Sequence, residues 1–170
     1  MLRLKWKEIL EVVGIFAVVA SLLFVGQQIR LDRQFAKEES SHLSAENQIA
    51  LSQLIADHAD VWIKGLIGED LSPSDRIRFN QIAYAVEMKY ISLYGRSVSG
   101  IRTGGVNNVA LNFAHHLHTY PGLRQTVLGK WDRMNKAFNR EFRFHSLVIQ
   151  YLEQIDKGEI EPVPKDFHAL

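Results

Sequence analysis

The residues of this chain that could bind a metal ion are histidines, together with one glutamate that lies near one of them in the sequence. His115 and His118 are three residues apart, so a helix would place both on one face. Glu39 and His42 form a Glu-x-x-His pair, the spacing that carboxylate-bridged di-iron bundles use. That chemistry needs a second such pair and carboxylates from two further helices, but the chain has one copy. We therefore predict no metal site, and these four residues are the candidates to test.

Other catalytic sites lack their sequence signatures. The 170 residues include no cysteine, which excludes thiol catalysis, cysteine-bound zinc or iron–sulfur clusters and covalently attached haem. There is no G-x-S-x-G turn, and the glycine-rich stretch 97–108 has no following Lys-Ser or Lys-Thr for phosphate binding. The 20 basic and 19 acidic residues balance without a basic stripe, which argues against nucleic acid as a partner. We predict no catalytic residue and no cofactor, and we favour a protein that is not an enzyme.

The elements that carry these residues are predicted to be helices. Residues 30–66 contain no proline and no glycine before Gly65, and are rich in residues that favour helix. Ser72, Pro73 and Asp75 then form a helix start: a capping hydroxyl, a proline at the first position and an acid where a capping box has one. The sequence therefore predicts one helix to about residue 66 and another from Pro73 to about residues 95–97.

Two further helical regions follow. The first is predicted over residues 106–119, and Pro121-Gly122 then predicts a turn. The second is predicted over residues 123–157, with a break near Gly129. Its apolar residues at helical spacing predict a core face, formed by Trp131, Met134, Phe138, Phe142, Ile149 and Leu152.

An uncharged stretch from Val12 to Ile29 predicts a transmembrane helix. At about 1.5 Å per residue, 18 helical residues cover about 27 Å, close to the roughly 30 Å hydrocarbon core. Ten strongly apolar residues favour insertion by roughly 3–6 kcal/mol in total. A cleaved signal peptide is the alternative, but the basic segment before the stretch also holds Glu8 and Glu11, and no A-x-A-like cleavage site follows. We therefore expect an uncleaved anchor.

The surroundings of this stretch leave its direction open. Lysine and arginine near its ends set the orientation of a membrane helix, and each side carries three. Within the stretch, Gly14, Ala17 and Ser21 form a strip of small residues, which can allow a second helix to approach closely. This strip predicts a homo-oligomer. The flanking charges are Arg3, Lys5 and Lys7 before the stretch and Arg30, Arg33 and Lys37 after it.

Three segments carry a resemblance to known proteins: WKEILEVVGIFAVVASLLFVGQQIR at the start, DVWIKGLIGEDLSPSDRIRF in the centre and YPGLRQTVLGKWDRMNKAFNREF later. With these segments the chain resembles small bacterial single-span membrane proteins of unknown function. They look like a tryptophan-led membrane helix ending in Gln-x-Arg, followed by a helical domain with a Pro-Gly turn. The resemblance implies this architecture at the bacterial inner (cytoplasmic) membrane, and it brings no activity with it.

The sequence therefore predicts an all-α protein with one N-terminal transmembrane helix and a small helical-bundle domain. We expect a non-enzymatic interaction or assembly module at the membrane surface, with the lipid bilayer and an unidentified protein as partners. The alternative is a tethered helical bundle that binds a ligand or metal, as a sensor or an enzyme. The predicted parts are an N-terminal flank (1–11), the transmembrane helix (12–29), a helical neck (30–44), the bundle domain (45–157) and an extended tail (158–170).

Overall fold

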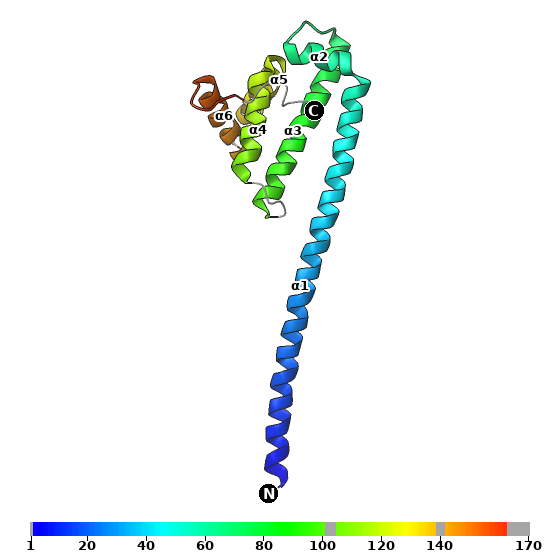
Figure 1. Cartoon of the computed structure of the whole chain (residues 1–170), viewed down its shortest axis with the longest axis vertical. Coiled ribbons are helices and arrows are strands. Elements are labelled where there is room, and N and C mark those ends of the chain that lie inside the picture. The colour runs from blue at the N-terminus through cyan, green and yellow to red at the C-terminus, as the bar shows by residue number, and fades with distance from the viewer. Residues whose placement is uncertain (1, 101–104, 139–141, 163–170) are drawn as a thin grey trace. The chain divides into compact units, whose positions relative to one another are not determined.

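The computed structural model describes residues 2–100, 105–138 and 142–162 (Figure 1). These residues form six α-helices and no strand, which confirms the all-α class, with a long N-terminal apolar helix and a helical domain. The chain divides into two compact units, Met1–Ala45 and Glu46–Leu170. The helices are α1 (Leu2–Asp57), α2 (Ala59–Ile67), α3 (Pro73–Val98), α4 (Val106–Thr119), α5 (Pro121–Phe138) and α6 (Arg143–Asp156).

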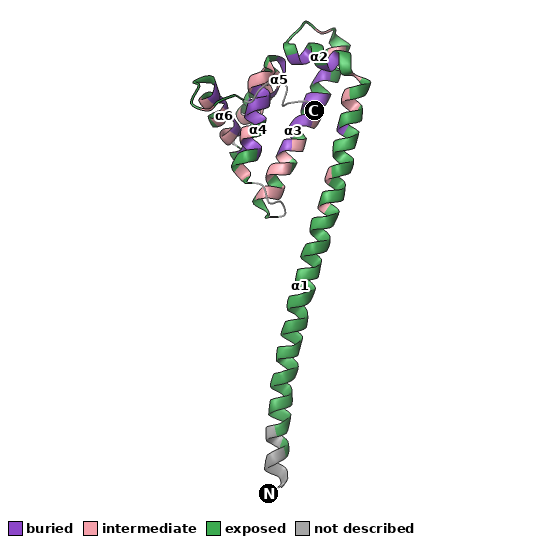
Figure 2. Ribbon diagram, in the orientation of Figure 1, coloured by how far each residue is buried: buried purple, intermediate pink, exposed green. Residues whose placement is uncertain are grey.

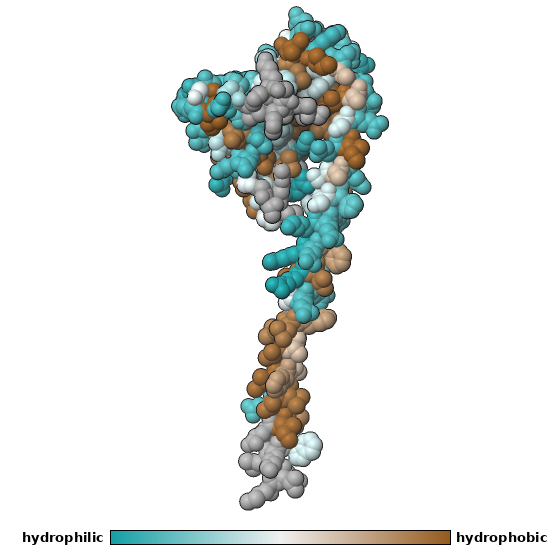
Figure 3. All heavy atoms as spheres, viewed as in Figure 1, coloured by the Kyte–Doolittle hydropathy of each residue, from teal (hydrophilic) through white to brown (hydrophobic). Residues whose placement is uncertain are grey.

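The first unit is helical throughout its described residues, all of which belong to α1. Every residue from Ile9 to Ile29 is exposed, so this stretch is green along its whole length in Figure 2. Figure 3 shows the same stretch as a continuous zone of apolar side chains, followed by hydrophilic ones. The helix therefore presents apolar side chains with no covering protein in this unit.

The predicted helix to about residue 66 is interrupted at His58, so this prediction is wrong at one point. His58 has φ −130° and ψ 33°, outside the helical region, and α2 begins at the next residue. The break redirects the chain so that Val61 and Trp62 are buried in the domain core. Gly68, with φ 81°, ends α2 in the left-handed conformation that glycine adopts without steric cost.

The predicted start of α3 is confirmed. Ser72 Oγ accepts a hydrogen bond from the Asp75 backbone N–H at 3.2 Å, and Pro73 occupies the first helical position. Because Ser72 satisfies a backbone donor that lacks a partner within the helix, it fixes where the helix begins. The helix predicted over residues 106–119 is also confirmed, as α4.

The predicted break near Gly129 is wrong, because α5 runs through this residue to Phe138. The helix also begins at Pro121, two residues earlier than predicted, and α6 begins at Arg143. The single helical spacing predicted from Trp131 to Leu152 is therefore interrupted between α5 and α6. Phe142, predicted to be in the core, lies in this interruption and is 39% exposed. The last eight residues of the predicted extended tail, 163–170, lie outside the described residues.

The core of the second unit is built around α4, which packs against α3, α5 and α6. Phe113 of α4 is fully buried and stacks on Tyr90 at 4.6 Å and on Phe144 at 5.9 Å between ring centroids. Such contacts add to the stabilisation from burying apolar area. The other largest fully buried side chains are Trp131, Ile82, Leu117, Leu123, Glu87, Val86, Val127 and Val148.

Candidate functional site

The structure does not assemble the four candidate metal ligands into one site. His115 is buried in α4, with 4% of its surface exposed, whereas His118 lies at the edge of the domain. Glu39 and His42 are exposed on α1 in the first unit. Across residues 2–100, 105–138 and 142–162, no group of three or more histidine or acidic side chains is arranged to bind a metal ion.

His118 belongs instead to an ion-pair cluster that joins three helices. Its Nδ1 lies 2.9 Å from Asp156 Oδ1 of α6. Arg124 of α5 donates from both terminal nitrogens to the same carboxylate, at 2.6 and 3.1 Å. These hydrogen bonds, with Arg124 contributing most, hold the pKa of Asp156 below its usual 3.8. A bidentate arginine–carboxylate pair fixes geometry, so this cluster holds α4, α5 and α6 together.

A buried carboxylate lies deeper in the domain, at Glu87 of α3. Only 2% of its surface is exposed. Its Oε1 accepts a hydrogen bond from Trp131 Nε1 at 2.9 Å, and its Oε2 accepts one from Lys130 Nζ at 2.7 Å. Burying an unpaired carboxylate is costly, and these two charge-assisted bonds offset that cost. The Trp131 ring also stacks on the His145 ring of α6, with 4.0 Å between the ring centroids.

Sequence reasoning missed this group, although one signal was present. Glu87 lies four residues after Ala83 and three before Tyr90, a helical spacing that puts it on the same face as these two buried residues. An acid at such a position indicates a buried partner. Its partners Lys130 and Trp131 are more than 40 residues away in the sequence, so their identity is a tertiary property.

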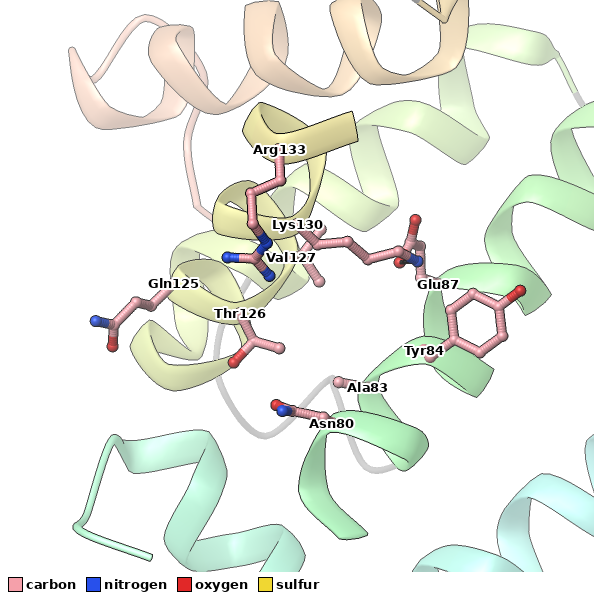
Figure 4. Close-up of a pocket in the computed structure, with 9 residues that line it drawn as sticks. All are labelled: Asn80, Ala83, Tyr84, Glu87, Gln125, Thr126, Val127, Lys130 and Arg133. Atoms are coloured by element: carbon pink, nitrogen blue, oxygen red, sulfur yellow. Dashed lines mark hydrogen bonds and ion pairs between the residues drawn. The ribbon is translucent and has the colours of Figure 1, made fainter. Parts of the chain in front are cut away.

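Glu87 of α3 and Lys130 of α5 both line a pocket between these two helices (Figure 4). The pocket has a volume of about 280 Å³. Lys130 reaches from α5 to Glu87, with its ammonium 4.1 Å from the centre of the Tyr84 ring. Such a contact between a cation and an aromatic face restrains the lysine. The lining residues are Asn80, Ala83, Tyr84, Glu87, Gln125, Thr126, Val127, Lys130 and Arg133.

Arg133 is the second cation of this pocket. It lies seven residues after Thr126 and three after Lys130, so α5 places all three on one side. No ion pair or hydrogen bond joins its guanidinium to another residue within the described parts of the chain. Its NH1 atom lies 3.7 Å from the position a Cβ of Gly129 would take, which places the guanidinium back along α5. Figure 4 shows the same direction.

The apolar stretch of α1 is the other candidate site. Within the described residues, α1 is the one helix with the length and composition to cross a membrane. Gly14, Ala17 and Ser21 are exposed on it, and an added Cβ at Gly14 would meet no atom within 4 Å. Self-association through these small residues stays a prediction.

Comparison with known proteins adds no relative. No family model, no curated protein and no solved structure matches the chain. The function must therefore be inferred from the residues of the chain itself.

Proposed function

We propose that α1 anchors this protein in a lipid bilayer through Val12–Ile29, and that the helical domain is a non-enzymatic interaction or assembly module at the membrane surface. The observation that carries the proposal is the apolar stretch of α1, in which every side chain is exposed. The resemblance to small bacterial single-span proteins supports placing the anchor in the inner membrane.

The distribution of the apolar side chains favours lipid over a protein partner. Val12, Val13 and Val18 project to different sides of α1, because successive helical residues are rotated by about 100°. One partner helix would cover a single stripe and leave the other sides in water. Burying each large apolar side chain is worth about 1.5–3 kcal/mol, so the uncovered sides would carry a large penalty. A hydrocarbon environment covers all sides at once.

The proposal is tested by placing charge in the middle of the stretch. Val19→Arg combined with Leu22→Arg should cost about 5–7 kcal/mol of insertion free energy, which cancels the roughly 3–6 kcal/mol that favours insertion. In cell fractionation, the unmodified protein should stay in the membrane pellet after carbonate washing, whereas the double variant should not. A matched control, Gln48→Arg with Gln53→Arg, adds the same charge on the exposed part of α1 beyond the stretch and should remain in the pellet.

Two results would contradict the anchor. One is an unmodified protein that carbonate releases from the membrane. The other is a double variant that remains as firmly in the pellet as the unmodified protein.

A further inference from the structure

We propose that the pocket between α3 and α5 binds a small molecule carrying a carboxylate or phosphate group, and that Arg133 holds this oxyanion. The inference goes beyond membrane anchoring and concerns the helical domain alone. It is therefore tested independently of the role of α1.

The charges of the lining residues favour an anion. Glu87 and Lys130 form an ion pair at 2.7 Å, so their charges cancel at the pocket wall. Arg133 then leaves one net positive charge, because it forms no ion pair with a described residue. A guanidinium is charged at all physiological pH values and presents donors in a planar fork that matches carboxylate and phosphate oxygens.

Neutral polar groups complete the donor set. Asn80 on α3 and Gln125 and Thr126 on α5 line the same pocket. Figure 4 shows Asn80 and Thr126 approaching each other from the two walls. Amide N–H groups and a hydroxyl can donate to the oxygens that Arg133 does not reach.

The dimensions and walls of the pocket indicate a small, mostly polar ligand. About 280 Å³ lies just below the range of roughly 300–1,000 Å³ that is usual for ligand pockets. Ala83, Val127 and the Tyr84 ring supply the apolar part of the lining. The oxyanion could be carried by a free metabolite or by a lipid headgroup, and both would present the same chemistry to Arg133.

Calorimetric titration of the full chain in non-ionic detergent tests the proposal. The probes are inorganic phosphate, malonate and glycerol 3-phosphate at constant ionic strength, and in a separate arm micelles doped with phosphatidylglycerol or with phosphatidylcholine. We expect saturable binding of at least one anionic probe. Arg133→Gln should weaken it by about 10- to 100-fold, the usual range for losing a charged hydrogen-bond donor. Binding of the soluble anions identifies a free ligand, and binding of phosphatidylglycerol alone identifies a headgroup.

Lys136→Gln is the matched control, because it removes one positive charge from an exposed position of α5 outside the pocket. It should bind as the unmodified chain does. Asn80→Ala, an uncharged change on the opposite wall, should weaken binding by about 2- to 10-fold. This second variant tests the same pocket if Arg133→Gln does not fold. The proposal is overturned if no anionic probe binds, if Arg133→Gln binds normally, or if Lys136→Gln loses as much affinity.

Discussion

Two glycines of the second unit lie where neighbouring helices come very close: Gly122 of α5 lies against α2, and Gly65 of α2 lies against α3. A Cβ on Gly122 would overlap the carbonyl oxygen of Gly65, which belongs to a rigid backbone. A Cβ on Gly65 would overlap the ring of Phe79. The sequence marked Gly122 as part of a turn after Pro121, but the residue lies inside the first turn of α5. Its function as a contact point depends on a residue 57 positions earlier, which no local pattern reveals.

Gly122→Ala should therefore destabilise the helical domain. We expect a loss of about 1–3 kcal/mol, the usual cost of overpacking, because the Gly65 backbone cannot move aside without shifting α2. Gly129→Ala is the control on the same helix, since its Cβ would meet only ordinary contact with Arg133. That change should stabilise the domain by about 0.5–1 kcal/mol. Urea unfolding followed by circular dichroism measures both, and equal effects of the two changes would contradict the close approach.

The buried carboxylate of Glu87 gives a second prediction for a single residue. Glu87→Ala removes one buried methylene group and the carboxylate and leaves the Trp131 N–H without its acceptor, so we expect a loss of about 2–4 kcal/mol. Glu87→Gln keeps an acceptor for Trp131 and should lose less. Lys130 is partly exposed and can reach water in either variant. Unfolding free energies of the two variants test this order, and a Gln variant less stable than the Ala variant would refute it.

For whole helices, local signals in the sequence predicted some boundaries and missed others. Ser72 and Pro73 act within one turn, so the start of α3 could be predicted. The interruption at His58 could not, because His58 is not a helix breaker and the bend exists to bury Trp62. Gly129 was expected to break α5, but tertiary packing of the helix overrides the weak preference of one glycine. The pocket was likewise unpredictable, because its residues come from two helices about 40 positions apart.

The cap of α3 gives a prediction at this scale. Ser72→Ala leaves the Asp75 backbone N–H without its acceptor and should destabilise the domain by about 1 kcal/mol. Ser92→Ala, at an exposed position within the same helix, should be neutral or slightly stabilising because alanine favours helix. Thermal melting monitored by circular dichroism compares the two. A Ser92 variant that melts as low as the Ser72 variant would argue against a specific cap.

The ion-pair cluster of α4, α5 and α6 should make stability depend on acidity. Hydrogen bonds from Arg124 and His118 place the pKa of Asp156 in the folded state below 3.8. A lowered pKa means that the unfolded chain binds this proton first as the pH falls. The stabilisation is therefore complete above about pH 5 and is lost progressively as the pH falls through 3.8 and towards the folded-state value.

Asp156→Asn should accordingly lower the unfolding free energy at pH 7 and have much less effect at pH 2. The difference at pH 7 should be modest, because the carboxylate is one-third exposed and solvent screens it. Arg124→Gln should reduce the same pH-dependent part, since Arg124 contributes most to the shift. Denaturant unfolding at both pH values measures these effects. An Asn variant that is equally destabilised at pH 7 and pH 2 would exclude the electrostatic origin.

At the scale of the whole molecule, the two units differ in whether they bury their own apolar side chains. The first unit exposes apolar side chains from Val12 to Ile29 and has no core of its own. The second buries its apolar side chains internally, around α4. The order of the apolar residues predicted both, because an uninterrupted apolar run and an amphipathic spacing differ in the sequence. What the domain binds depends on the few polar residues at α3 and α5, and composition does not reveal it.

The equal numbers of lysine and arginine residues at the two ends of the apolar stretch lead to a prediction about its orientation in the membrane. Given that α1 spans the bilayer as we propose, orientation follows the lysine and arginine bias, and three cations lie on each side. Neutralising Arg30 and Arg33 to glutamine should move the helical domain towards the outside, whereas neutralising Lys5 and Lys7 should hold it inside. The chain has no cysteine, so a single cysteine at Ser40 or Ser99 reports the side by reaction with a membrane-impermeant thiol reagent on intact cells. Labelling should increase in the first variant and decrease in the second, and identical labelling of both would show that these charges do not set the direction.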